Sequence, residues 1–305
     1  KHFAGDGMAA EGTSIATWQR PGVFDRGDVQ MPIEDILEYG VESYRPAVEA
    51  GVAAVMVSTV AWNGEKVHGS HYAITELLKG ELGFQGMVLT DWGGIGELPG
   101  TLDDQVASAV NAGADLLMQA DDWDDVRASI ERLAGGQIPN ERMQDAVTRI
   151  LQVKCETGLF DFYRDEALLA TVGSAEHREV ARQAVRESVV VLHNENDVLP
   201  LAKDASVWVG GSGADDMERQ CGGWTVGWQG GGGAMAGTTV RASIANVAPV
   251  VDSMDDAAVG VVVLSEESHA EWIGDRTVDE FAQVLPAADF DLLDDLGTRG
   301  IPIVA

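Results

Sequence analysis

Short apolar runs alternate with stretches of helical periodicity through the first half of the chain. The runs at 53–58, 87–92 and 115–119 have the length of buried strands, and each precedes a stretch with helical spacing. The opening KHFAG is expected to be a further strand. Helices are expected over 33–51, 73–83, 103–113, 124–136 and 140–160. This β–α order predicts parallel strands joined by helices.

Parallel strands of this kind belong to an α/β fold, either a barrel or a doubly wound sheet. Several of the expected strands end in polar or charged residues, which points to an active face at their carboxyl ends. Four β–α units make only half of an eight-stranded barrel, and a half barrel leaves two open sheet edges. We therefore expect a partial TIM-like (β/α) barrel, with an N-terminal half that precedes the given residues.

A second domain is expected after a polar stretch and a helix over 175–192. Its strands are expected at 205–211, 257–267 and 301–305, with one helix over 279–297 between the last two. The chain stops directly at the last strand, so we expect truncation here as well. The predicted division is a half barrel over 1–160, a linker and connecting helix over 161–198, and an α/β domain over 199–305.

The net charge of the chain limits the classes of partner that it can bind. The 305 residues carry 50 acidic and 20 basic side chains, for a formal charge of −30, which disfavours nucleic acid, anionic membranes and polyanionic substrates. A neutral substrate fits better. No apolar run reaches the 18 residues of a membrane span, so no membrane insertion is expected, and the first residues have no signal-peptide pattern from which to read a localisation.

The sequence predicts no metal and no cofactor. Cys155 and Cys221 are too few for a disulfide framework and are either free thiols or a single bridge. His68 and His71 lack both a third ligand and the spacing of helical metal ligands.

Two segments carry carboxylates at the ends of expected strands. Asp91, in LTDWGG, is placed either to attack a substrate or to cap the following loop. Glu266 and Glu271, in SEESHAEWIGDR, are either general-acid candidates or part of a solvated acidic loop. Glycoside hydrolysis usually needs two carboxyl groups in unlike environments.

Other residues suit neutral sugars. Trp224 and Trp228 lie in a glycine-rich stretch, where exposed indoles could pack on sugar faces, although two core tryptophans are the alternative. Lys1 and His2, at the expected end of a strand, could bind sugar hydroxyls and a nearby carboxylate.

Six motifs resemble glycoside hydrolase family 3, in the family's order, over nearly the whole chain. The resemblance is greatest to the exo-β-glucanase and β-glucosidase branch, which includes cereal exo-1,3/1,4-β-glucanases. It implies a barrel followed by an α/β sandwich with the active site between them, and a periplasmic or secreted retaining hydrolase that releases glucose from β-glucan oligosaccharides or β-glucosides. The motifs are KHFAGDG, WNG, LTDWGG, DAVTRILQVK, CGGWTVGWQG and VLSEESHAEWIGD.

By motif, the resemblance gives each candidate a role. Asp91 is the nucleophile, and Glu266 is the acid/base residue, with Glu271 as the second choice. Sugar-binding residues are Lys1 and His2, with a tryptophan clamp of Trp92 and Trp228 beside Trp224. Thr59 stands where the family usually has a tyrosine, and Ser268 and His269 replace a Pro and a Tyr in the acid/base loop.

These departures leave alternatives open. A non-catalytic carbohydrate-binding homologue is the main one, and a β-N-acetylglucosaminidase is the lesser one, because KHFAGDG is not followed by that branch's Asp-His pair. The family's substrate-binding Asp and Arg from earlier strands lie outside the given sequence, so these residues alone are not expected to turn over substrate. Linkage preference and oligomeric state are not predicted.

Overall fold

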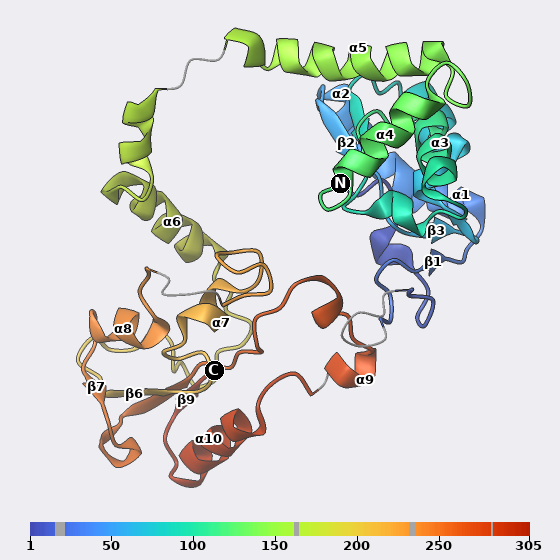
Figure 1. Ribbon diagram of the computed structural model, residues 1–305. Helices are drawn as coiled ribbons and strands as arrows, with labels where there is room; N and C mark the ends of the chain where they lie inside the picture. The colour runs from blue at the N-terminus through green and yellow to red at the C-terminus, as the bar shows by residue number, and fades with distance from the viewer. Residues whose placement is uncertain (16–21, 162–164, 232–235, 282) are drawn as a thin grey trace. The chain divides into compact units, whose positions relative to one another are not determined.

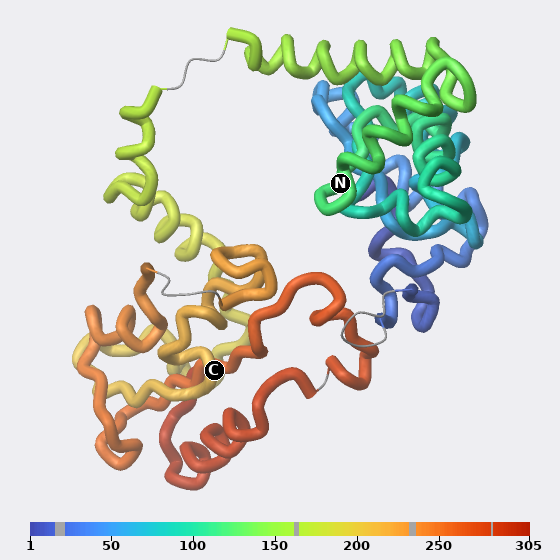
Figure 2. The backbone as a smooth tube through the Cα atoms, viewed as in Figure 1, coloured from blue at the N-terminus to red at the C-terminus, as the bar shows by residue number. Residues whose placement is uncertain are grey.

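The computed structural model describes residues 1–15, 22–161, 165–231, 236–281 and 283–305. Its contacts divide the chain into two compact units, Lys1–Phe162 and Tyr163–Ala305. Figure 2 traces the first unit in blue to green and the second in yellow to red. Each unit has its own parallel strands and its own apolar core. The finer division at residues 160 and 198 stays a prediction.

The first unit combines short strands with helices (Figure 1). Its strands are β1 (Asp28–Val29), β2 (Ala54–Met56), β3 (Ala61–Trp62), β4 (Glu65–Lys66) and β5 (Met87–Leu89). Its α-helices are α1 (Ile33–Asp35), α2 (Arg45–Glu49), α3 (Leu102–Ala112), α4 (Trp123–Leu133) and α5 (Asn140–Glu156). The other helical turns are Asp6–Met8, Ile36–Val41, Glu42–Tyr44, Val67–Gly69, Tyr72–Glu81, Gly94–Glu97 and Leu159–Asp161.

Four parallel segments lie side by side in the order in which the chain reaches them. β2 and β5 pair in the centre. Phe3 bridges Val57 beyond β2, and Leu116 bridges Leu89 beyond β5. The predicted strands at 53–58 and 87–92 are confirmed, although shorter, whereas KHFAG and 115–119 contribute only single bridges. The carboxyl ends of the four parallel segments therefore lie along one edge, as a barrel-type arrangement requires.

The helix predicted over 33–51 is confirmed as one helical segment from Ile33 to Glu49, whose hydrogen-bond pattern changes along its length. The segment consists of α1, a π-helical turn over Ile36–Val41, a 3₁₀ turn over Glu42–Tyr44 and α2. Pro46 lies in the first turn of α2. Because proline has no N–H and clashes with the preceding turn, it suits a helix start better than a helix interior.

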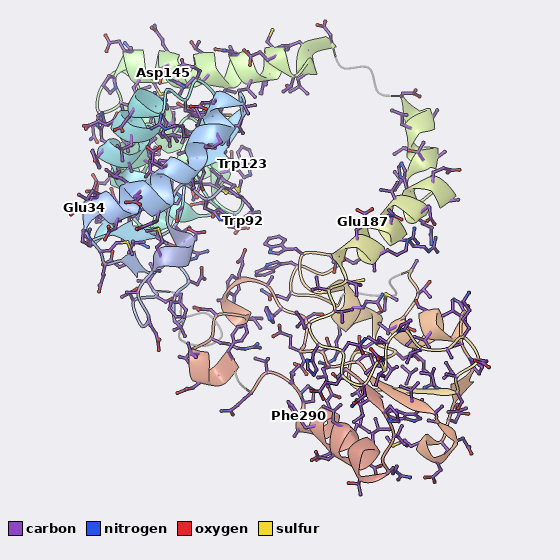
Figure 3. The ribbon with its side chains drawn as sticks, turned by 180° about the vertical axis from the view of Figure 1, so that it is seen from behind. Glu34, Trp92, Trp123, Asp145, Glu187 and Phe290 are labelled. Carbon is purple, nitrogen blue, oxygen red and sulfur yellow. The ribbon has the colours of Figure 1, made fainter. Side chains whose placement is uncertain are left out.

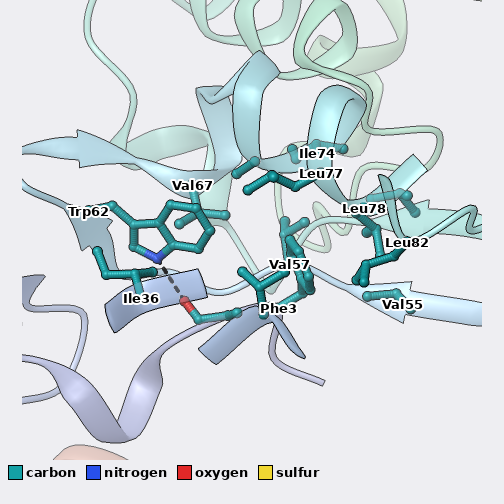
Figure 4. Close-up of a cluster of buried hydrophobic side chains, with 14 of the residues drawn as sticks. Phe3, Ile36, Val55, Val57, Trp62, Val67, Ile74, Leu77, Leu78 and Leu82 are labelled. Carbon is teal, nitrogen blue, oxygen red and sulfur yellow. Dashed lines mark hydrogen bonds between the residues drawn. The ribbon is translucent and has the colours of Figure 1, made fainter. Parts of the chain in front are cut away.

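The WNG segment forms a tight hairpin that supports the opening segment KHFAG. Asn63 and Gly64, both with positive φ, connect β3 to the antiparallel β4, as an Asn-Gly turn favours. Trp62 is 7 % exposed and donates from its indole Nε1 to the carbonyl of Ala4 at 2.9 Å. Figure 4 shows this bond beside Phe3, Ile36 and Val57 of the core. The hairpin thus fixes the backbone between His2 and Asp6.

Helix α5 contacts the rest of the first unit largely through ion pairs and hydrogen bonds, because Ala146 is the only buried residue of this helix. Lys79 Nζ lies 2.8 Å from Asp115 Oδ1, and Arg142 also pairs with Asp115. Asp115 accepts the N–H of Val88 in β5 at 2.8 Å. Arg149 of α5 donates to the carbonyls of residues 84 and 86, both at 3.0 Å. The network joins α5 to the amino end of β5.

The second unit is built on a parallel sheet with the strand order β7-β6-β8-β9. These strands are β6 (Val207–Gly210), β7 (Val250–Val251), β8 (Val259–Val262) and β9 (Ile303–Val304). Its α-helices are α6 (Ala175–Ser188), α7 (Met217–Cys221), α8 (Val240–Ala245), α9 (Val278–Phe281) and α10 (Ala287–Thr298). The strands predicted at 205–211, 257–267 and 301–305 are confirmed, and β7 is an addition.

The single helix predicted over 279–297 is wrong, because two helices occupy this segment. α9 ends at Phe281, Ala282 lies outside the described residues, and α10 begins after Pro286. α10 packs close to β8, where a Cβ on Gly260 would lie 2.6 Å from Leu296 Cδ1. Both cysteines of the chain are free and exposed. Of the described helices, none has the length and apolarity that crossing a membrane requires.

Removing the Asp115 carboxylate is expected to destabilise the protein strongly. Asp115→Ala leaves Lys79, 7 % exposed, and Arg142 without a buried partner, which costs about 3–5 kcal/mol. Urea unfolding followed by tryptophan fluorescence measures the loss. The control Arg127→Ala breaks an exposed pair with Glu131 and should change stability by less than about 1 kcal/mol. Equal losses in the two variants would contradict a structural role for the buried network.

Candidate active site

The site of the first unit is built around Asp91, which follows β5 at its carboxyl end. The preceding Thr90 is fully buried, and its Oγ1 accepts the N–H of Met118 at 2.8 Å. The N–H of Gly93 donates to the carbonyl of Met118 at 2.9 Å. Gly93 has a φ of 63°, which glycine adopts without steric cost. The loop is therefore tied to the neighbouring parallel segment on both sides of Asp91.

A buried histidine holds the backbone of Asp91. The N–H of Asp91 donates to Nε2 of His68 at 3.0 Å, and His68 is 1 % exposed. Gly94 leaves room for the ring, because a Cβ there would lie 2.3 Å from His68 Nε2. Burial, followed by the charges of Lys66 and Arg26, lowers the pKa of His68 to about 4. The ring is therefore neutral near pH 7 and can accept this hydrogen bond.

Among the described residues, the carboxylate of Asp91 has two contacts. Its Oδ1 accepts the N–H of Trp92 at 2.6 Å, a local bond of the capping kind. Its Oδ2 lies 3.4 Å from Nε2 of His2. The side chain is 26 % exposed, and the adjacent Trp92 is 56 % exposed (Figure 3). The capping interpretation thus explains one oxygen, while the other faces His2 and remains reachable.

Asp6, which sequence reasoning did not assign, binds the other side of His2. Nδ1 of His2 lies 2.8 Å from Asp6 Oδ2, and the hydroxyl of Ser58 donates to Asp6 Oδ1. Burial acts to raise the pKa of Asp6, but the hydrogen bonds from His2 and Ser58 bring it below its ordinary value. The only signal in the sequence was the position of Asp6 inside KHFAGDG.

The remaining predicted residues of the first unit have different surroundings. Lys1 and His2 line a pocket of about 390 Å³ together with Asp6 and Tyr44. Thr59 is 8 % exposed, and its carbonyl accepts a hydrogen bond from Lys66 Nζ at 2.7 Å. Within the described part of the chain, no hydrogen bond joins the Thr59 side chain to Asp91. The hydroxyl that the family's tyrosine would supply there is not replaced by threonine.

A charged triad, also missed from the sequence, supports the loop after Asp91. Glu97 is the last residue of the Gly94–Glu97 turn, and its side chain is 10 % exposed. Its two oxygens lie 2.7 Å from Arg26 Nη1 and 2.8 Å from Lys66 Nζ. Lys66 also bonds the carbonyl of Thr59, so the triad links this loop to the segment between β2 and β3.

In the second unit, Glu266 is held by two basic groups of its own loop. Its Oε2 lies 3.1 Å from His269 Nε2 and 2.9 Å from Arg276 Nη1. Gly274 makes room for the imidazole, since a Cβ there would lie 2.4 Å from His269 Nδ1. Glu271 instead begins a 3₁₀ turn, with a φ of 50°. Glu266 is thus in contact with His269, one of the two residues at which the acid/base loop departs from the family pattern.

The tryptophan-rich loop of the second unit packs on the Glu266 loop. The rings of Trp224 and Trp228 have centroids 6.2 Å apart, and Trp228 meets the buried Trp272 edge-on at 4.9 Å. Gln229 Oε1 accepts the N–H of Ala270 at 2.8 Å. Trp224 is 68 % and Trp228 41 % exposed, so both indoles retain accessible surface. This arrangement favours the sugar-binding interpretation over two core tryptophans.

The described residues contain no candidate metal centre. In those ranges, no three or more His, Cys, Asp or Glu side chains are grouped so as to hold a metal ion. His68, the histidine that invited a metal interpretation, instead accepts the N–H of Asp91.

The sequence of the chain matches the model of a known protein family. The model of the glycosyl hydrolase family 3 N-terminal domain matches residues 1–153, half of the chain. The chain therefore belongs to glycosyl hydrolase family 3. The expected α/β class, a barrel-type first unit followed by a second α/β unit, is confirmed by the parallel strands and by similarity to solved members of the family.

The relatives are β-glucosidases and an exo-glucanase. The lysosomal beta glucosidase of Dictyostelium discoideum is 33% identical over 218 residues, covering 68% of this chain and 27% of that protein. The periplasmic beta-glucosidase of Salmonella typhimurium is 30% identical over 258 residues, covering 81% and 32%. A mutant exo-1,3/1,4-beta-glucanase from a Pseudoalteromonas species matches with a TM-score of 0.87 and 31% identity, covering 100% and 50%. The chain thus spans at most half the length of these proteins.

Replacing His68 by glutamine is expected to remove a pH-dependent part of stability. The folded pKa of about 4 lies below the ordinary 6.5, so the unfolded chain binds more protons between these values and wild-type stability falls as the pH falls. Glutamine keeps an acceptor for Asp91 but does not titrate. Between about pH 7.5 and pH 4, the stability difference should shift by about 3 kcal/mol in favour of His68→Gln.

Urea unfolding at both pH values measures this shift. His71→Gln is the matched control, because His71 is exposed and only three residues away. A difference between wild type and His68→Gln that stays constant with pH would show that the fold does not keep His68 neutral.

Proposed function

We propose that this chain is part of an exo-acting β-glucan hydrolase of the β-glucosidase type. Such an enzyme releases glucose from non-reducing ends with retention of configuration. The observation that carries the proposal is the setting of Asp91. Its backbone is held by buried His68, and one carboxylate oxygen faces His2 at 3.4 Å. A carboxylate held at the end of a parallel strand, with part of its surface accessible, suits a nucleophile.

The reaction follows from two carboxyl groups with different tasks. Asp91 attacks the anomeric carbon and forms a glycosyl ester, while the glycosidic C–O bond breaks and its electron pair stays on the leaving oxygen. Glu266 gives its proton to that oxygen. Glu266 then takes a proton from water, whose oxygen attacks the anomeric carbon and releases Asp91. Two inversions at the same carbon retain its configuration.

The contacts of Glu266 are compatible with its proposed role as the acid/base residue. His269 and Arg276 reach the same oxygen, Oε2, and hold the side chain in one orientation. Ser268, which replaces the family's proline, donates to the carbonyl of Glu218 at 2.6 Å and anchors the loop.

The proposed substrates are β-glucan oligosaccharides and β-glucosides. Lys1 and His2 can donate to sugar hydroxyls, and the exposed faces of Trp92, Trp224 and Trp228 can pack on pyranose rings. The charge of −30 is compatible with a neutral ligand. We further propose a periplasmic or secreted location, which the name of the Salmonella relative supports.

A non-catalytic carbohydrate-binding protein is the second candidate. Two observations favour it: Thr59 does not supply the tyrosine hydroxyl that the family resemblance implies beside Asp91, and Ser268 and His269 alter the loop that carries Glu266. Such a protein would bind laminari- or cello-oligosaccharides without releasing glucose.

The nucleophile can be trapped as its ester. When the full-length protein is incubated with an activated 2-deoxy-2-fluoro-β-glucoside, the fluorine slows hydrolysis of the intermediate, and mass spectrometry should find one label on the peptide that contains Asp91. Asp91→Asn should carry no label. A label on any other peptide would overturn the assignment, and oligosaccharide binding without a label or released glucose would favour the non-catalytic candidate.

The acid/base residue can be identified by azide rescue. Glu266→Ala should lower turnover of unactivated β-glucosides by about 10²- to 10⁴-fold, and azide should restore rate on an activated substrate by giving the β-glucosyl azide. Glu271→Ala, five residues away in the same loop, is the matched comparison. Rescue of Glu271→Ala and not of Glu266→Ala would reverse the assignment.

A further inference from the structure

An unbroken line of contacts runs from a buried hydroxyl to the proposed nucleophile. Ser58 donates to Oδ1 of Asp6, Oδ2 of Asp6 lies 2.8 Å from Nδ1 of His2, and Nε2 of His2 lies 3.4 Å from Oδ2 of Asp91. All four residues belong to the first unit. The proposed roles of His2 and Asp91 do not account for the two residues behind them.

The fold holds Asp6 firmly in this line. Ser58 is fully buried, and its Oγ also accepts the N–H of Val60 at 3.0 Å, so its hydroxyl has a fixed direction. Gly5, just before Asp6, has a φ of 108°, a backbone conformation that L-residues rarely adopt. A Cβ on Gly5 would also lie 3.3 Å from Val29. The positive φ and the close contact with Val29 therefore favour glycine at position 5, immediately before Asp6.

The charge of Asp6 determines which nitrogen of His2 donates. A pKa lowered by the His2 and Ser58 hydrogen bonds, against burial, keeps Asp6 ionised near neutral pH. An ionised carboxylate only accepts hydrogen bonds, so Nδ1 of His2 must carry a proton. With Nδ1 donating to Asp6, the protonation of Nε2 decides whether His2 donates to Asp91 or presents a lone pair to it.

We propose that Asp6 is a positioning residue of the active site, which fixes the ring and the Nδ1 proton of His2 so that Nε2 serves the nucleophile Asp91. The inference rests on the proposed function and deepens it. Among the described residues, the side chain of Asp6 contacts His2 and Ser58, so it acts on Asp91 through His2. The arrangement has the form of a carboxylate that orients an imidazole, as in hydrolytic triads, although here the imidazole faces a carboxylate nucleophile.

The test compares Asp6→Asn and Asp6→Ala with Glu11→Gln in the full-length protein. Glu11 is an exposed acid of the same segment, so its variant removes a charge without touching the line of contacts. With a nitrophenyl β-glucoside, both Asp6 variants should lose about 10- to 100-fold in kcat/KM, mostly in kcat, the effect of one charge-assisted hydrogen bond. Glu11→Gln should match wild type.

The pH profile separates positioning from mere folding support. The groups around His2 are Asp6 and Asp91 on its two nitrogens, Lys1 beside it, Tyr44 across the pocket and neutral His68 behind Asp91. Loss of the Asp6 charge should shift the kcat/KM profile along the pH axis, in Asp6→Asn as well as Asp6→Ala. A wild-type profile in both variants would overturn the proposal.

A readout independent of activity distinguishes this proposal from the proposed function. In ¹⁵N-histidine-labelled protein, with His2→Gln used for assignment, the His2 ring should show a protonated Nδ1 in wild type and Glu11→Gln. In Asp6→Ala it should show a mixture of tautomers. An unchanged ring state in Asp6→Ala would overturn the proposal even if Asp91 is labelled, whereas a changed ring with no labelling of Asp91 would leave Asp6 positioning His2 and remove the hydrolytic role.

Discussion

The hydrogen bond from the Asp91 backbone to His68 is the constraint on which the candidate site depends. It requires a neutral imidazole, and burial beside the positive charges of Lys66 and Arg26 supplies one. It also requires a ring in van der Waals contact with the loop, which is possible only because residue 94 is glycine. The direction of the carboxylate, its contact with His2 and the exposure of Trp92 all follow from the backbone position set by this bond.

The fold could be predicted from the sequence to the extent that local patterns decide it. Apolar runs correctly located β2, β5, β6, β8 and β9, because buried parallel strands are nearly continuous in apolar residues. The pattern failed at Pro286, which precedes α10 and ends the possibility of a single helix over 279–297. It also failed at 115–119, where Leu116 makes only one bridge and the loop contacts of Met118 replace a strand.

The site shows the same limit more sharply. Asp91, His2 and Glu266 stand in recognisable motifs, so sequence reasoning could find them. His68, Asp6 and Glu97 could not be assigned because their partners lie 23, 52 and 71 positions away in the chain, at Asp91, Ser58 and Arg26. Contacts of that range depend on how the strands are placed, and no periodicity or spacing encodes them. The departures at Ser268 and His269 prove to have contacts of their own, with Glu218 and Glu266.

The Asn63–Gly64 hairpin connects the surface of the first unit to the backbone of the candidate site. Its turn is exposed, yet Trp62 at its base binds the carbonyl of Ala4, midway between His2 and Asp6. Because the indole recognises a main-chain carbonyl, side-chain changes at the turn reach the site only by shifting the backbone. For protein engineering, this surface turn is therefore a place where substitutions can tune the candidate site without altering any of its side chains.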